Sequence, residues 1–257
     1  MGDEFSKIHA KKCLAGEGFI VEEIPTARNE RRADLRAAWS NEEYVIEAKG
    51  KNQTASWTSL VSEAKRGALA STSRDVKPWN ALSAVIRDAN EQLSSTPASN
   101  TAFRVLWLVA AHNDSAFVLS CIEKRLFGLE NVVVIKSFHT LPIVKPCYYH
   151  SHSDFIRFPD LDAAILSNLQ TGYMCVNSFS HRREALRSSR LYSILNKRGA
   201  VRDPEIAESE GIAFLIAENI NHSSSGGQWK YLKEKYGYGT CVMMDTQFNA
   251  LLSVDLS

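Results

Sequence analysis

The stretch Glu43-Tyr44-Val45-Ile46-Glu47-Ala48-Lys49 decides the fold of this chain. Its β-branched centre predicts a strand. Because side chains alternate along a strand, Glu47 and Lys49 project from one face, while Ala48 points to the other and leaves its carbonyl near the first. Asp34 precedes Glu47 by thirteen residues, in the strand expected just before this one. Antiparallel pairing of the two strands would place the two carboxylates side by side.

The residues around this stretch predict an α/β protein. The first three strands follow one another and the later strands alternate with helices, which is typical of a mixed β-sheet flanked by helices. Helices are expected at 3–15, 60–69, 79–93 and 115–127, and strands at 19–24, 33–39, 43–49, 103–111 and 131–135. The polar residues 50–78 also predict a mobile loop beside the helix they contain.

Two prolines, Pro142 and Pro146, predict a linker that divides the chain. Residues 1–140 would then form the core, and residues 141–257 would form a C-terminal α+β extension. The extension contains polar predicted strands and a basic predicted helix. We therefore expect it to bind substrate or to form an oligomer interface.

The composition excludes several classes of protein. The chain has 257 residues, 44% of them hydrophobic and 23% charged, which excludes a disordered chain. Its five cysteines are scattered and form no C-x-x-C pair, so a disulfide framework and a structural zinc site are not expected. The formal net charge of +1 excludes a globally basic nucleic-acid-binding protein, so any basic surface must be local.

The sequence predicts a cytoplasmic protein without a membrane partner. The first twelve residues are polar and charged, unlike the apolar segment of an export signal. The longest apolar run, 105–111, is far too short to span a bilayer.

The two carboxylates and the lysine of the central stretch indicate metal-assisted chemistry. Asp34, Glu47 and the Ala48 carbonyl are hard oxygen ligands of the kind that Mg²⁺ and Mn²⁺ prefer. Lys49 beside them can orient a water molecule and neutralise charge on an attacked phosphate. The set therefore predicts hydrolysis of a phosphodiester.

Asp34, twelve intervening residues and Glu47-Ala48-Lys49 resemble the PD-(D/E)xK nuclease superfamily. The predicted first helix, followed by Gly18-Phe19-Ile20-Val21, is also similar to archaeal Holliday-junction resolvases and restriction-endonuclease-like domains. The resemblance covers about the first 140 residues. It implies a restriction-endonuclease-like sheet and a Mg²⁺-dependent or Mn²⁺-dependent endonuclease acting on DNA, in restriction, repair or phage defence. It also implies metal ligation by Asp34, Glu47 and Ala48, and catalysis by these carboxylates with Lys49.

Two supporting positions of the family are matched less closely. Many relatives carry a metal-supporting glutamate in the first helix, where Glu4 is the nearest candidate and His9 and Glu17 are alternatives. Many also carry a glutamine in the helix after the motif strand, followed four residues later by tyrosine. Gln92 lies on that predicted helix, but Thr96 stands in place of the tyrosine.

A local basic stretch offers phosphate contacts. Residues 182–202 contain seven basic residues and one acid. A single helix near 181–197 would place Arg183, Arg187 and Arg190 on one face, either to contact phosphates or as an ordinary solvated surface. The predicted nucleic-acid contacts are Arg182, Arg183, Arg187 and Arg190 in this stretch and Lys65, Arg66 and Arg74 after the motif strand.

Other interpretations remain open. The chain can be a nuclease-like module that binds DNA or a protein without cleavage, or a subunit that acts only within a larger complex. A homodimer is expected if both strands of a duplex are cut, since two symmetric sites do this most simply. His150, His152 and Asp154 have strand spacing and could bind zinc from one face of a strand. No further ligand is visible in the sequence, so an exposed polar strand is favoured over a zinc site. Trp57 is the one tryptophan expected in a polar loop, where it could stack on a base.

Overall fold

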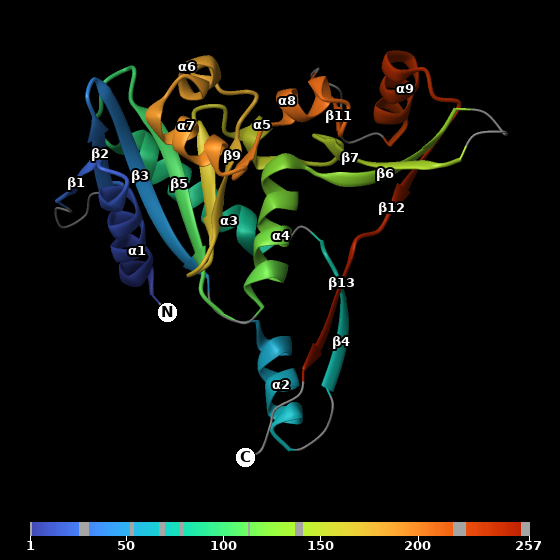
Figure 1. Ribbon diagram of the computed structural model, residues 1–257, viewed down its shortest axis with the longest axis horizontal. Helices are drawn as coiled ribbons and strands as arrows, with labels where there is room; N and C mark the ends of the chain where they lie inside the picture. The colour runs from blue at the N-terminus through green and yellow to red at the C-terminus, as the bar shows by residue number, and fades with distance from the viewer. Residues whose placement is uncertain are drawn as a thin grey trace.

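The computed structural model describes residues 2–25, 31–51, 54–66, 70–77, 80–112, 114–136, 141–217 and 225–252. Its main feature is a seven-stranded mixed sheet with helices on both faces (Figure 1). The strand order is β1-β2-β3-β5-β8-β9-β10. The predicted α/β class, a large mixed sheet flanked by helices, is therefore confirmed.

The elements follow one another along the chain without internal repetition. The helices are α1 (Asp3–Gly16), α2 (Ala55–Ala64), α3 (Asn80–Ser95), α4 (Ser115–Phe127), α5 (Asp154–Arg157), α6 (Arg183–Arg187), α7 (Arg190–Lys197), α8 (Pro204–Ser209) and α9 (Ser225–Tyr236). The strands are β1 (Ile20–Glu23), β2 (Leu35–Trp39), β3 (Glu42–Lys51), β4 (Ala70–Asp75), β5 (Phe103–Ala110), β6 (Glu130–Ile135), β7 (Ile143–Tyr148), β8 (Ala163–Ser167), β9 (Gly172–Val176), β10 (Val201–Arg202), β11 (Phe214–Leu215), β12 (Thr240–Met244) and β13 (Gln247–Leu252).

The first half of the large sheet follows the predicted order. Strands β1, β2 and β3 form an antiparallel meander, and β5 lies parallel to β3. Gly18 makes the turn from α1 into β1 with φ +88°, a backbone conformation that side chains disfavour. A Cβ at this position would also lie 2.9 Å from the ring of Trp39, so the turn requires glycine.

Each face of the sheet is covered by its own pair of helices. Helices α1 and α7 pack over Tyr44, Ile46 and Ala48 of β3. Helices α3 and α4 pack over the other face, where Val45 lies. Glu47 and Lys49 share the side of Val45, so the strand directs them towards α3. None of the described helices is long and apolar enough to cross a membrane.

The large sheet continues past the predicted boundary at residue 140. Strand β8 pairs in parallel with β5, and β9 and β10 extend the sheet further. The predicted linker is wrong at Pro146, which lies inside β7. Proline is tolerated at a strand edge, and β11 pairs with β7 only at Cys147 and Tyr148, so none of the described strands pairs with this edge of β7 at Pro146.

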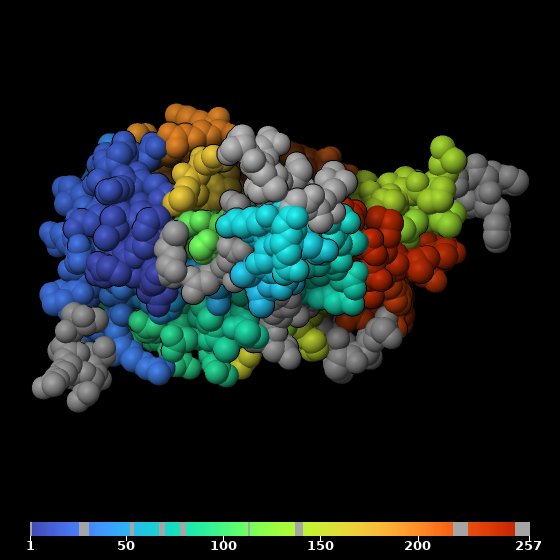
Figure 2. Space-filling model, turned by 90° about the horizontal axis from the view of Figure 1, so that it is seen from below, coloured from blue at the N-terminus to red at the C-terminus, as the bar shows by residue number. Residues whose placement is uncertain are grey.

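The remaining strands form two smaller sheets, β11-β7-β6-β12 and β13-β4. Helix α2 begins earlier than predicted because the Thr54 side chain caps it by accepting the N–H of Trp57 at 3.3 Å. Strand β4 lies where a mobile loop was expected, because it pairs with β13 from the far end of the chain. Figure 2 shows α2 between the side of α1 and the C-terminal strands.

Candidate active site

The pairing of β2 with β3 places Asp34 beside Glu47. Leu35 lies opposite Ile46, and the N–H of Asp34 donates to the Ile46 carbonyl at 3.1 Å. Oδ2 of Asp34 accepts the N–H of Ala48 at 2.9 Å. This contact holds the Asp34 carboxylate against the backbone between Glu47 and Lys49. The two strands therefore bring together the acids that the sequence indicated.

Lys49 forms a close ion pair with Glu47. Its Nζ lies 2.6 Å from Oε1 of Glu47, and the glutamate side chain is only 1% exposed. The second oxygen of Glu47, Oε2, is buried and has no hydrogen-bond partner among the described residues. A buried acceptor left without a partner is costly, so this oxygen marks a position where a ligand would be favourable.

We call Asp34, Glu47 and Lys49 the carboxylate cluster. The pKa values of these residues reflect their burial and their closeness to one another. Burial raises the pKa of Glu47 to about 8, and the neighbouring charge of Asp34 adds to the effect. Burial also raises the pKa of Asp34, against the opposing hydrogen bond from Ala48. Burial alone would lower the pKa of Lys49, but the hydrogen bond to Glu47 and the nearby acids outweigh it and raise the pKa.

Two further acids, which the sequence analysis did not single out, lie near Lys49. Nζ of Lys49 is 3.9 Å from Oδ2 of Asp3 and 3.8 Å from Oδ2 of Asp88. Asp3, in the first turn of α1, also accepts the N–H of Gly50 at 3.0 Å. An open depression beside the cluster is lined by Asp3, Lys49, Gly50, Lys51, Ala84, Val85, Arg87 and Asp88.

Gln92 reaches the cluster through Asp88. Its Nε2 donates to Oδ2 of Asp88 at 3.1 Å, one helical turn away on α3. Thr96, which stands in place of the family's tyrosine, anchors the segment just before β2: its hydroxyl accepts the N–H of Ala33 at 2.7 Å. Asp88 was missed in the sequence analysis. Its position one turn before Gln92 on an amphipathic helix could have indicated that it lies beside Gln92.

The acids of α1 are arranged differently from the prediction. The side chain of Glu4 is 70% exposed and pairs with Lys7 at 2.8 Å, so it lies outside the contacts of the cluster. His9 and Glu17 line a separate groove on the other face of the sheet. Asp3 is the acid of α1 that contacts Lys49.

The cluster has the donors that a hard divalent cation needs. Asp34 and Glu47 provide carboxylate oxygens, one of them buried and without a partner among the described residues, and Ala48, which follows Glu47 in sequence, provides a backbone carbonyl. Within the described ranges, no three His, Cys, Asp or Glu side chains are grouped to hold a metal. The fit therefore depends on two carboxylates and the backbone oxygen.

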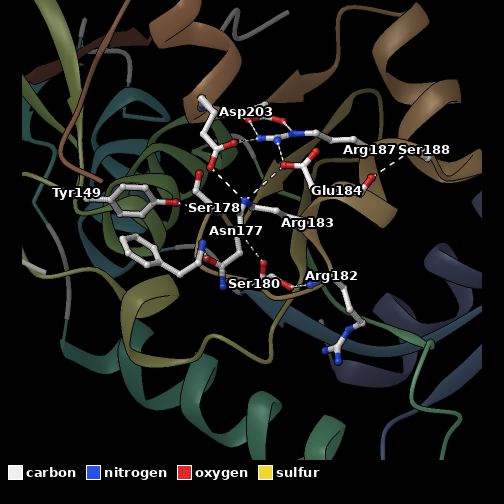
Figure 3. Close-up of polar contacts among 12 residues, drawn as sticks. Tyr149, Asn177, Ser178, Ser180, Arg182, Arg183, Glu184, Arg187, Ser188 and Asp203 are labelled. Atoms are coloured by element: carbon white, nitrogen blue, oxygen red, sulfur yellow. Dashed lines mark hydrogen bonds and ion pairs between the residues drawn. The ribbon is translucent and has the colours of Figure 1, made fainter. Parts of the chain in front are cut away.

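Three of the arginines predicted to contact DNA, Arg182, Arg183 and Arg187, are paired with acids of this chain. Figure 3 shows Arg187 beside Asp203 and Glu184. The predicted single basic helix is wrong: Ser189 caps a second helix by accepting the N–H of Tyr192, so α6 and α7 are separate. Arg183 and Arg187 lie on α6, whereas Arg190 begins α7, and the three do not share one face of one helix.

Arg182, Arg183 and Arg187 form what we call the arginine network. Nε of Arg182 lies 2.9 Å from Oδ2 of Asp162, which is fully buried. Nε and Nη2 of Arg187 donate to the two oxygens of Asp203 at 2.7 and 2.8 Å, and this contact raises the pKa of Arg187. Arg183 and Arg187 both pair with Glu205. These side chains stabilise the fold through bidentate and buried pairs.

The other predicted contacts divide into exposed and buried residues. Lys65 and Arg66 are exposed at the end of α2. Arg74 packs against Phe117, with its guanidinium 3.8 Å from the ring centroid. Trp57 lies on α2 rather than in a polar loop, and its side chain is buried against Ala70 of β4 and its own helix. The polar strand expected around His150 is absent from the described residues: β7 ends at Tyr148 and α5 begins at Asp154, which pairs with Arg125 at 2.9 Å.

Comparisons with protein-family models, curated proteins and solved structures found no match to this chain.

Proposed function

We propose that this protein is a cytoplasmic, metal-dependent endonuclease that hydrolyses phosphodiester bonds of DNA and has a restriction-endonuclease-like fold. The observation that carries the proposal is the buried Glu47 oxygen without a partner, lying beside Asp34 and ion-paired through its other oxygen with Lys49. The strand order β1-β2-β3-β5, with β3 parallel to β5, supports the family resemblance of the sequence.

Each residue of the cluster has a defined task in this proposal. Asp34, Glu47 and the Ala48 carbonyl would hold Mg²⁺ or Mn²⁺, and the Ala48 N–H fixes the orientation of the Asp34 carboxylate. A bound cation of this kind polarises the scissile phosphate as a Lewis acid. Lys49 donates hydrogen bonds that orient the attacking water and offset the charge that develops on the phosphate.

Asp88 and Asp3 act as positioning residues for Lys49. Both carboxylates lie just under 4 Å from Nζ, on opposite sides of the sheet end from which Lys49 projects. The contact with Glu47 keeps the lysine protonated, which is the form that donates hydrogen bonds, and the charges of Asp3 and Asp88 add to this effect. In a homodimer, a second copy would bring an equivalent site to the other DNA strand.

The test is cleavage of supercoiled plasmid with Mg²⁺ or Mn²⁺ by the wild type and by Lys49→Met and Asp34→Asn. We expect both variants to lose on the order of 10²–10³-fold or more of the cleavage rate. Lys12→Met, on the exposed side of α1, is the matched control and should cleave like the wild type.

The outcomes separate the proposal from its alternatives. Equal cleavage by the wild type and both variants would contradict it. Mn²⁺ binding by calorimetry without cleavage of plasmid, single-stranded DNA or RNA would favour a non-catalytic nuclease-like module. Cleavage that requires a partner extract would indicate a subunit of a larger complex.

A further inference from the structure

A second cavity lies on the opposite face of the large sheet from the carboxylate cluster. It has a volume of about 480 Å³ and lies between α1, α7 and the turn that joins β8 to β9. We call it the α1–α7 groove. Trp107 and Ile165 of the sheet line it together with Leu14 of α1 and Leu191 and Ile194 of α7. These helices lie on the same face of the sheet in Figure 1.

Trp107 and Asn168, two of the polar side chains that line the α1–α7 groove, already have hydrogen-bond partners within the protein. Nε1 of Trp107 donates to Oγ of Ser167 at 3.0 Å. Oδ1 of Asn168 accepts the N–H groups of Gln170 and Thr171 at 2.8 and 2.7 Å, which closes the turn between β8 and β9. A ligand in this groove therefore meets mainly apolar surface and is not required to supply hydrogen bonds.

The charges that line the groove cancel one another. Arg198 at the end of α7 pairs with Glu17 at the end of α1, with Nη2 and Oε1 2.7 Å apart. This pair joins the two helices at the groove. Burial lowers the pKa of His9, so its ring is neutral at neutral pH. A charged ligand would find no unpaired opposite charge among these lining residues.

We propose that the α1–α7 groove binds an uncharged, largely apolar small molecule. Its volume lies within the range of about 300–1,000 Å³ that is typical of small-molecule sites, and such sites are lined mostly by apolar and aromatic side chains. The neutral lining matches an uncharged ligand, because burying a charge without a partner is costly. A nucleotide or another polyanion does not fit this lining.

The groove is independent of the proposed cleavage site. Trp107 lies opposite Ala48 in the pairing of β3 with β5, but both side chains point away from Glu47 and Lys49. Binding in the groove therefore needs no metal and no nucleic acid. A negative result for the groove leaves the nuclease proposal intact, and the reverse also holds.

The test is titration of the full chain with N-phenyl-1-naphthylamine, an uncharged apolar dye that fluoresces when it leaves water. We expect saturable binding of one dye per chain. Ala200→Phe fills the groove and Leu169→Glu places a charge at its exposed rim, so each should weaken dye affinity about tenfold or more. Ala185→Phe, the same substitution on the exposed side of α6, should bind like the wild type.

A further variant tests the main competing surface. Met243 of β12 is 50% exposed in a strand with other exposed apolar residues, so Met243→Ser should leave dye binding unchanged. Loss of binding in Met243→Ser would overturn the proposal, and so would wild-type affinity in both folded groove variants or binding that does not saturate. If Ala200→Phe fails to fold by circular dichroism, Leu169→Glu decides, since Leu169 is 53% exposed.

Discussion

The carboxylate cluster and the arginine network both contain buried acids, but the acids differ in how completely their oxygens are paired with basic side chains. In the arginine network, Asp162 and Asp203 each contact the guanidinium of an arginine. In the cluster, Asp34 and Glu47 lie together, and the close ion pair of Lys49 is with one oxygen of Glu47. The fully paired acids of the arginine network stabilise the fold, whereas the partly paired Glu47 keeps one oxygen available to a ligand.

The largest effect on stability is expected from breaking a complete pair. In Arg187→Met, the Asp203 carboxylate, with a side chain only 2% exposed, loses both hydrogen bonds from Arg187. An unpaired buried charge should reduce the free energy of unfolding by about 3–5 kcal/mol. Urea denaturation at neutral pH measures this loss.

The matched control removes a more exposed arginine of the same network. The side chain of Arg183 is 38% exposed and its nearest acid, Glu205, keeps a contact with Arg187. Arg183→Met should therefore destabilise the protein much less than Arg187→Met. Equal losses would show that the network is not held by the buried Asp203 pair.

In the carboxylate cluster, by contrast, we expect the removal of a charge to raise the free energy of unfolding, because the ionised form of Glu47 is unfavourable where it is buried. The folded-state pKa of about 8 lies above the ordinary value of 4.5, so the folded protein favours protonated Glu47. Wild-type stability therefore falls as pH rises from about 4.5 to 8, while Glu47→Gln avoids this loss. At about 1.4 kcal/mol for each tenfold change in proton affinity, the rise of the pKa from 4.5 to about 8 corresponds to about 5 kcal/mol. Glu47→Gln also loses the ion pair with Lys49, so we expect a net gain of about 2–4 kcal/mol above pH 8.

The measurement is urea denaturation of both proteins in EDTA between pH 4 and 9. The two unfolding free energies should converge near pH 4 and separate as the pH rises. A Glu47→Gln variant that is less stable than the wild type at pH 8.5 would contradict the proposed cost of the ionised carboxylate. Addition of Mn²⁺ should stabilise the wild type more than the variant, since only the wild type retains both carboxylates.

Local sequence patterns were sufficient for the first half of the large sheet. The β-branched centre of β3 and the apolar run of β5 predict strands without help from other segments, and the alternation of Glu47 and Lys49 places them on one face. Strand β4 could not be predicted in this way. Its residues are polar, and they form a strand by pairing with β13, which follows more than 170 residues later.

The site shows the same division between local and distant information. The motif spacing predicts that Asp34 and Glu47 lie side by side, because their positions depend only on the antiparallel register of β2 and β3. Neither Asp88 nor Asp3 belongs to that register, and both reach Lys49 through helix packing. The basic residues at 182–202 suggested a free basic surface, because the acids that pair with Arg182, Arg183 and Arg187 lie outside that stretch. These acids are Asp162, Asp203 and Glu205.

The comparison also predicts which basic residues contact DNA. Paired arginines are not available to phosphates, whereas Lys65 and Arg66 are exposed, with no ion pair to either side chain in the part of the chain that the structure describes. If the protein binds DNA, Lys65→Ala with Arg66→Ala should weaken binding about tenfold and reduce the slope of log affinity against log salt by about 2. Fluorescence anisotropy at several salt concentrations measures both quantities. An unchanged slope would exclude these two residues as phosphate contacts.

The smallest effect is expected at Arg190, whose partner is an aromatic ring rather than an acid. Its guanidinium lies 4.6 Å from the centroid of Trp39, and its backbone N–H donates to Glu42. Arg190→Ala keeps the backbone contact and loses the cation–π contact, so urea denaturation should show a loss of only about 0.5–1 kcal/mol. Arg190→Lys should recover part of it, since an ammonium also binds a ring face. A loss as large as that of Arg187→Met would mean that the side chain of Arg190 also compensates a buried acid, and the contrast between the two arginines would then disappear.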